Sequence, residues 1–208
     1  MSRSLAIFGA GGHGRVIAEC AEANGWTSIR FFDDGGAGSV ASSDWSVEGT
    51  GADLLTHASS FDGVVVGIGA NAVRLAWMQR LVDAGASLAT VVHPSAIVSS
   101  RAFIGAGSVV FPGAVINIGA RLGKAVIINT AATVDHDGRI GDGAHISPGA
   151  HLAGAVTVGR GSWIGIGAAV REGVTIGHQV CVGAGAVVVK SVDDGLTVVG
   201  NPARSLKR

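Results

Sequence analysis

A six-residue period constrains the fold of this chain more than any other feature of the sequence. Every sixth residue from Val98 to Val188 is Val, Ile or Leu. The position two residues earlier holds only Ala, Ser, Val or Gly, and glycine is frequent three residues after each aliphatic residue. Each hexapeptide therefore combines an inward aliphatic residue, a turn that tolerates unusual backbone dihedrals and a small inward residue at the corner.

This period excludes a helical fold and a β-sandwich for the C-terminal half of the chain. It matches neither the helix period of about 3.6 residues nor the turn spacing of roughly eight to twelve residues in a β-sandwich. Short strands stacked coil on coil in a parallel β-helix produce such a pattern. The 34 glycines among 208 residues, without the polarity of a disordered chain, also indicate a repeat.

The N-terminal third has a different pattern, in which strands alternate with helices. The hydrophobic pattern predicts a helix after the first glycine turn, an amphipathic helix ending near Gly85, and buried strands at residues 5–9, 28–34 and 62–69. This alternation predicts a small parallel sheet of Rossmann type.

The two patterns meet near His93, where His-Pro ends the last strand and the hexapeptides begin. No low-complexity linker separates them. We therefore predict two domains, an α/β nucleotide-binding domain at residues 1–92 and a β-helix domain with a C-terminal cap at residues 93–208.

The first glycine turn satisfies the motif G-x-G-x-x-G between a strand and a helix, with glycines at Gly9, Gly11 and Gly14. A diphosphate can approach the backbone of such a turn, and the helix N-terminus favours its charge. The alternative is that these glycines serve only tight packing, but His13 within the turn favours ligand contact. Asp33 and Asp34 follow the second strand, and an α/β part of about 90 residues has room for one nucleotide.

His136 occupies a corner position of the repeat, two residues after the inward Val134. Other hexapeptides hold residues of no common type there, so a buried core histidine is disfavoured. Asp137 follows at a position that is small in most other hexapeptides. The pattern leaves two alternatives open, an exposed surface histidine and a functional one.

The charge balance argues against several classes of partner. The net charge is zero, with 15 basic and 15 acidic residues, so nothing indicates a field for nucleic acid or a membrane surface. No segment has the roughly 18 consecutive apolar residues of a spanning helix, and no signal-peptide pattern is present, so we expect a cytoplasmic protein. Cys20 and Cys181 form no CxxC pair, and we expect both to be buried.

Seven short motifs in a fixed order give the chain a resemblance to the PglD/NeuD family of sugar acyltransferases: FGAGGHG (8–14), FFDD (31–34), GIGAN (67–71), HPSA (93–96), NTAATVDHD (129–137), GAHISPGAHLAG (143–154) and GNPAR (200–204). The resemblance covers essentially the whole chain. It implies a left-handed parallel β-helix with three hexapeptides per coil, so that residues 18 apart stack. It also implies a homotrimer, with acetyl-CoA bound between adjacent β-helices and a nucleotide sugar bound by the N-terminal domain.

The resemblance also implies a role for individual residues. His136 matches the general base, and Asp137 matches an acidic neighbour that raises its basicity. That neighbour is Glu in other members, so Asp135 remains an alternative partner. The contacts to the nucleotide sugar fall on Gly11, Gly12, His13, Asp33 and Asp34. The contacts to acetyl-CoA fall on His145, Ile166 and Ala184.

The expected activity is N-acetylation of a UDP- or GDP-linked 4-amino-4,6-dideoxy sugar, because a neutral imidazole can accept the proton of an attacking amine. The alternatives are O-acetylation of a sialic acid and a nucleotide-sensing trimeric scaffold without catalysis. A zinc enzyme of the γ-carbonic-anhydrase type is a further rival. No two histidines of the repeat are 18 residues apart, so we expect no metal site.

Overall fold

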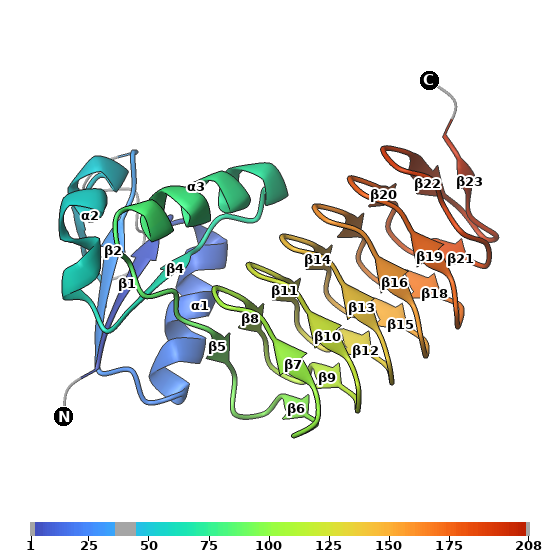
Figure 1. Ribbon diagram of the computed structural model, residues 1–208, viewed down its shortest axis with the longest axis horizontal. Coiled ribbons are helices and arrows are strands. Elements are labelled where there is room, and N and C mark those ends of the chain that lie inside the picture. The colour runs from blue at the N-terminus through green and yellow to red at the C-terminus, as the bar shows by residue number, and fades with distance from the viewer. Residues whose placement is uncertain (1–2, 36–44, 207–208) are drawn as a thin grey trace. The chain divides into compact units, whose positions relative to one another are not determined.

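The computed structural model describes residues 3–35 and 45–206, and the chain divides into two compact units (Figure 1). The N-terminal unit extends to Pro94 and includes Ala106–Ser108, and the β-helix unit contains Ser95–Gly105 and all described residues from Val109 onward.

The N-terminal unit is built on a four-stranded, fully parallel sheet with the order β3-β2-β1-β4. Its strands are β1 (Ser4–Phe8), β2 (Ser28–Phe32), β3 (Val47–Gly49) and β4 (Gly63–Val66). The helices are α1 (Gly12–Ala23), α2 (Gly51–His57), the short 3₁₀ helix η1 (Ala58–Ser60) and α3 (Asn71–Asp83), and the strand β5 (Val91–Val92) follows them.

Helices cover both faces of this sheet. Side chains alternate along each strand, so both faces present side chains against which helices can pack. Phe8 of β1 stacks on Trp77 of α3, with ring centroids 3.7 Å apart. On the opposite face Phe31 of β2 lies against Gly14 of α1, where a β-carbon would come within 3.2 Å of the phenyl ring. The predicted Rossmann-type layering is present, with every residue from Leu5 to Phe8 buried.

The sequence patterns predicted β1, α1, β2, β4 and α3, but neither β3 nor α2. Strand β3 has only three residues, too few for a period of two to stand out. Helix α2 is short and depends on a local device: the Thr50 hydroxyl accepts from the backbone N–H of Asp53, whose carboxylate accepts from the N–H of Thr50.

The β-helix unit consists of stacked coils with three flat faces (Figure 1). The first face contains β8 (Val109–Val110), β11 (Ile127–Ile128), β14 (His145–Ile146), β17 (Trp163–Ile164), β20 (Cys181–Val182), β22 (Thr197–Val199) and the antiparallel β23 (Arg204–Ser205). The second contains β6 (Ile97–Val98), β9 (Val115–Ile116), β12 (Thr133–Val134), β15 (His151–Leu152), β18 (Ala169–Val170) and β21 (Val187–Val188). The third contains β7 (Phe103–Ile104), β10 (Arg121–Leu122), β13 (Arg139–Ile140), β16 (Thr157–Val158) and β19 (Thr175–Ile176).

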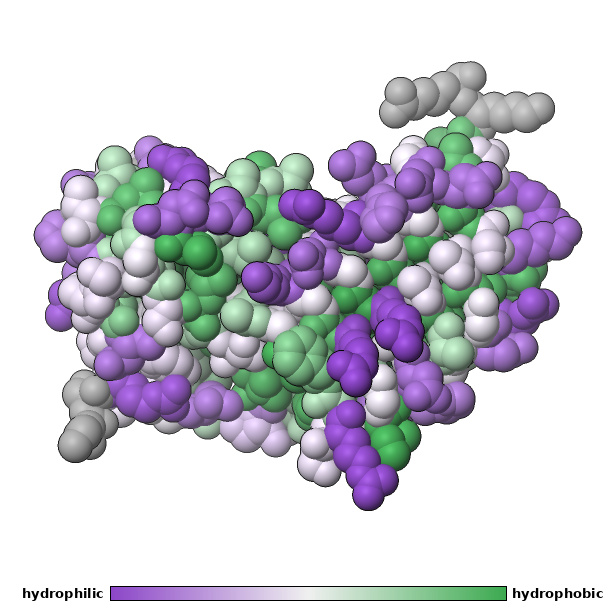
Figure 2. Space-filling model, viewed as in Figure 1, coloured by the Kyte–Doolittle hydropathy of each residue, from purple (hydrophilic) through white to green (hydrophobic). Residues whose placement is uncertain are grey.

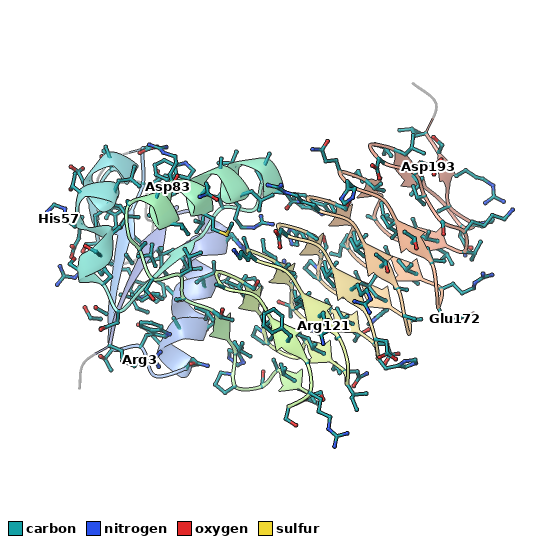
Figure 3. The ribbon with its side chains drawn as sticks, in the orientation of Figure 1. Arg3, His57, Asp83, Arg121, Glu172 and Asp193 are labelled. Atoms are coloured by element: carbon teal, nitrogen blue, oxygen red, sulfur yellow. The ribbon has the colours of Figure 1, made fainter. Side chains whose placement is uncertain are left out.

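Parallel pairing holds residues 18 apart in register from coil to coil, as in Ile127 with His145 and Thr133 with His151. Three hexapeptides therefore make one coil. The periodic aliphatic residues from Val110 to Val188 are all at most 3% exposed and form the core. Outward side chains such as Arg121 and Glu172 project from the coils (Figure 3). The space-filling view shows hydrophobic surface among the hydrophilic residues of the β-helix (Figure 2).

The corners use a left-handed backbone at every sixth residue. From Gly107 to Gly185 each such residue has a positive φ between 52° and 74°. Glycine adopts this conformation without strain, and it occupies most of these positions. The exceptions are Ala125, Ala131, Asp137, Ala155 and Gln179. The predicted turn with unusual dihedrals is therefore present, and it repeats with the period of the sequence.

Candidate active site

His136 and Asp137 form a hydrogen-bonded pair on one corner of the β-helix. We name this corner, which lies between the second and third faces, the His136 corner (residues 117–119, 135–137 and 153–155). The Nδ1–H of His136 donates to Oδ2 of Asp137 over 3.0 Å, since a carboxylate only accepts. The side chains are 59% and 70% exposed, so the histidine is not a core residue. This pairing leaves Nε2 as the nitrogen that can accept a proton.

The environment makes the imidazole more basic. The hydrogen bond to Asp137 raises the pKa of His136 above its ordinary value of 6.5. Limited desolvation opposes this change, and the negative charges of Asp137 and Asp135 add to it. The corner therefore holds a histidine with the basicity and the tautomer of a general base.

The two aspartates beside His136 have different partners. Asp135 accepts a hydrogen bond from the side-chain amide of Asn117 in the preceding coil. Asp137 adopts the left-handed conformation with φ 60°, and its carboxylate accepts the hydrogen bond from the imidazole. In this geometry Asp137 is the aspartate that contacts the ring.

A cavity of about 430 Å³ in the N-terminal unit is lined by all five residues predicted to contact the nucleotide sugar: Gly11, Gly12, His13, Asp33 and Asp34. The cavity lies where β1 and β4 end and α1 begins, so the backbone N–H groups of the helix N-terminus are available to an anion. The sequence patterns did not identify Phe8, Val73 and Trp77, which form an apolar wall. The turn GIGAN follows the third predicted strand and leads into α3, so it could have indicated Val73 and Trp77.

The glycines of the first turn serve two different purposes. A β-carbon on Gly14 would overlap the carbonyl oxygen of Gly9, so the fold itself requires Gly14. A β-carbon on Gly11 would have no heavy atom within 4 Å, and one on Gly12 would meet only the end of the Arg15 side chain at 3.9 Å. Packing alone therefore explains Gly14 but neither Gly11 nor Gly12, which face the cavity.

The carboxylates of Asp33 and Asp34 hold the rim of the cavity together. Asp33 accepts from the backbone N–H of Ala10 and of Gly35, each over 2.7 Å. Asp34 accepts from the N–H of Gly51 at the start of α2, over 2.8 Å. The bonds from Ala10 and Gly51 are tertiary, the bond from Gly35 is local, and both side chains still line the cavity.

His13, which lines this cavity, has a neutral imidazole. Burial, together with the positive charge of Arg74, lowers the pKa of His13 to about 4. The buried Arg74 guanidinium donates to the carbonyls of Ile68 and Gly69 and to Oδ1 of Asn71, over 2.9 to 3.1 Å. A neutral imidazole can either donate or accept at physiological pH.

A second cavity, of about 410 Å³, lies on the β-helix and is lined by the three residues predicted to contact acetyl-CoA: His145, Ile166 and Ala184. We name it the first-corner pocket, because it covers the corner between the first and second faces. Trp163, which the sequence patterns did not identify, stacks on His145 with centroids 4.4 Å apart. The spacing of 18 residues between His145 and Trp163 could have identified it.

The expected burial of both cysteines is wrong for one of them. Cys20 is buried, but Cys181 is exposed and lines the first-corner pocket. Cys181 precedes the inward Val182, so strand alternation turns its side chain outward.

The described part of the chain contains neither a metal cluster nor a membrane-spanning helix. Within residues 3–35 and 45–206, no group of three or more His, Cys, Asp or Glu side chains is placed to hold a metal ion. None of the helices in this described part is long and apolar enough to cross a membrane.

The contrast between Gly12 and Gly14 predicts opposite effects on stability. We expect Gly14→Ala to lower the free energy of unfolding by at least about 2 kcal/mol, because the added methyl group overlaps the backbone. Gly12→Ala should leave it unchanged or raise it by about 0.5 kcal/mol, because the helix position accepts alanine. Urea denaturation of both variants measures this, and equal losses would contradict the division of the two glycines.

Family models match both units of the chain. The PglD N-terminal domain matches residues 4–81, and the bacterial transferase hexapeptide of six repeats matches residues 155–190. A search of curated proteins returns no match.

Solved structures match the chain over nearly its whole length. The acetyltransferase domain of PglB from Neisseria gonorrhoeae is 45% identical with a TM-score of 0.93, covering 99% of this chain and 100% of that one. PerB from Caulobacter crescentus, in complex with CoA and GDP-perosamine, is 37% identical with a TM-score of 0.93, covering 98% and 97%. WeeI from Acinetobacter baumannii is 28% identical with a TM-score of 0.88, covering 99% and 100%.

These matches confirm the predicted fold class, an α/β Rossmann-like domain followed by a left-handed parallel β-helix. They extend through both units and through the hexapeptides that carry His136. The chain is an acyltransferase and belongs to the PglD/NeuD-type family of sugar acetyltransferases.

Proposed function

We propose that the chain transfers the acetyl group of acetyl-CoA to the amine of a UDP- or GDP-linked 4-amino-4,6-dideoxy sugar, with His136 as the general base. The main support for this proposal is the hydrogen-bonded pair of His136 and Asp137 on an exposed corner. Its tautomer leaves Nε2 open, and its raised pKa suits the acceptance of a proton from an amine.

The reaction needs no covalent enzyme intermediate. The neutral amine attacks the thioester carbonyl carbon as Nε2 of His136 takes one of its protons, and a C–N bond forms. The tetrahedral intermediate collapses, the C–S bond breaks, and the imidazolium returns its proton to the CoA thiolate. Asp137 stabilises the imidazolium through Nδ1 and keeps the ring in one tautomer.

The cavity of the N-terminal unit is the proposed site of the nucleotide sugar. Gly11 and Gly12 leave room for a diphosphate at the N-terminus of α1, where the helix dipole favours its charge. Asp33 and Asp34 can accept from the ring N–H groups of uracil or guanine. The complex of PerB with GDP-perosamine supports a nucleotide-linked amino sugar as the acceptor.

The first-corner pocket is the proposed site of acetyl-CoA. Its exposed apolar lining, with Trp163 and Ile166, suits the hydrocarbon parts of the cofactor's long arm. The acetyltransferase domain of PglB has also been solved in complex with acetyl coenzyme A. That structure supports acetyl-CoA as the acetyl donor of this chain.

We propose that the chain forms a homotrimer, and the positions of these two features on the β-helix support this. His136 lies on the corner between the second and third faces, whereas the first-corner pocket lies between the first and second. One β-helix therefore carries the base and the donor pocket on different corners. A ring of three chains in head-to-tail contact can bring the His136 corner of one chain to the pocket of the next.

A thiol-release assay with acetyl-CoA and a panel of UDP-, GDP-, dTDP- and CMP-linked amino sugars tests the activity. We expect release with a UDP- or GDP-linked 4-amino-4,6-dideoxy sugar, and His136→Ala should lower its rate by at least about 100-fold. Release only with a free sialic acid would instead indicate O-acetylation. No release with any acceptor would favour a nucleotide-sensing scaffold.

The matched control is His178→Ala. His178 occupies the same position of the hexapeptide as His136 and is also exposed, but it lies on the third corner of the coil. We expect this variant to keep wild-type turnover. An unchanged rate in His136→Ala, with both variants folded by circular dichroism, would contradict the assignment of the base.

The basicity of His136 predicts a pH profile. Because its pKa is raised above 6.5, His136 stays protonated to a higher pH, and kcat should fall as the pH decreases through that raised value. Asp137→Asn removes the carboxylate, so the acidic limb should move to lower pH and the plateau rate should drop about tenfold. Asp135→Asn is the control, with a smaller movement expected. An acidic limb of the pH profile that stays in place in Asp137→Asn would refute the pairing of His136 with Asp137.

Mixing two inactive variants tests whether the site is shared between chains. His136→Ala removes the base, and Ala184→Trp fills the first-corner pocket. Random trimers of the two variants in equal amounts should recover about a quarter of wild-type activity, because an intact base then meets an intact pocket at one interface in four. The two variants are unfolded and refolded together before activity is measured. Zero recovery would show that each site lies within one chain.

A further inference from the structure

The corner position of His136 recurs fourteen times between Ala106 and Ala184, and only one of these residues is glycine. That residue is Gly154, which lies 18 residues after His136 and therefore directly above it in the next coil. The backbone N–H of the adjacent Ala155 donates to the carbonyl of His136 over 2.8 Å, which holds the two coils in this register. The single glycine of the series thus adjoins the proposed base.

The space above His136 is filled by its own ring. The three heavy atoms nearest to a β-carbon placed on Gly154 all belong to the imidazole of His136, and Nε2 and Cε1 would overlap it. The ring therefore lies against the bare backbone of Gly154, with its Nε2 and Cε1 atoms nearest to the position of the missing β-carbon. Any side chain at position 154 would compete with the imidazole for this space.

Neither the backbone nor the rest of the packing explains this glycine. Gly154 is absent from the positive-φ corner residues, so its conformation suits any L-residue. The turn glycines Gly141, Gly159 and Gly165 differ, because a β-carbon on each would overlap the backbone of the next coil. Among these four glycines, only Gly154 is limited by a side chain alone.

We propose that Gly154 is a positioning residue for the base: its missing side chain leaves the space in which the His136 ring lies, with Nδ1 on Asp137 and Nε2 beside the backbone of Gly154. The effect on catalysis rests on the proposed function, but the effect on the ring does not. A methyl group at position 154 turns the imidazole about its χ1 bond. That rotation separates Nδ1 from the Asp137 carboxylate, so both the orientation and the raised pKa of the base are lost.

The variant Gly154→Ala tests the proposal by two independent readouts. In the intact full-length protein, NMR titration should show the pKa of His136 falling toward 6.5, as we also expect for Asp137→Asn, in which the carboxylate is removed. The kcat should fall at least tenfold, whereas the KM for acetyl-CoA should change less than threefold. A wild-type titration of His136 in Gly154→Ala would overturn the proposal, whatever the activity of the enzyme.

The same substitution in a His136→Ala background separates a local clash from general misfolding. Without the ring, the methyl group has room, so the double variant should be as thermally stable and as active as His136→Ala alone. If Gly154→Ala fails to fold, recovery of folding in the double variant supports the clash with His136. A further loss of melting temperature in the double variant would overturn the proposal.

The proposed function and this inference can fail separately. Full activity in His136→Ala would remove the base assignment, yet the titration in Gly154→Ala would still show whether Gly154 positions the ring. Conversely, if His136→Ala abolishes activity while His136 keeps its wild-type pKa in Gly154→Ala, His136 would remain the base, and Gly154 would not be a positioning residue.

Discussion

The hydrogen bonds between successive coils, which hold residues 18 apart in register, are the constraint on which the rest of the β-helix depends. Because this register is rigid, a side chain on one corner has a fixed neighbour above and below it. His136 therefore lies against Gly154, and the carboxylate of Asp137 lies beside Gly119, where a β-carbon would come within 2.5 Å of Oδ1. At this left-handed corner, Asp137 accepts a hydrogen bond from the imidazole. A local pair thus gains its orientation from the repeat.

Glycine has two roles in both units, and the distinction locates the functional surfaces. Gly14 and Gly159 are required by the backbone, because a β-carbon on either would overlap neighbouring main-chain atoms. Gly11 and Gly154 are not, since the first faces an open cavity and the second faces only the ring of His136. A glycine that the fold does not require leaves space for something else, which we infer to be a diphosphate in one case and the base in the other.

Most of the fold could be predicted from the sequence, because the six-residue period continues without interruption and each aliphatic position is buried from Val110 onward. The predicted contact residues of each cavity also lie together. Helix α2 escaped prediction because its seven residues are too few for a helical period to stand out, and the bond from the N–H of Ala10 to Asp33 is tertiary. The sequence left Asp135 and Asp137 as alternative partners of His136, because the hydrogen bonds of Asp135 with Asn117 and of Asp137 with the imidazole appear only in three dimensions.

We propose that Asp137 holds His136 as the Nδ1–H tautomer with a raised pKa, so that Nε2 is the basic nitrogen. Nitrogen-15 NMR of the imidazole in the full-length protein measures the tautomer and the pKa together. The account predicts a protonated Nδ1 and an unprotonated Nε2 in the neutral ring, with a pKa above 6.5. A neutral ring protonated on Nε2, or a pKa at or below 6.5, would contradict it.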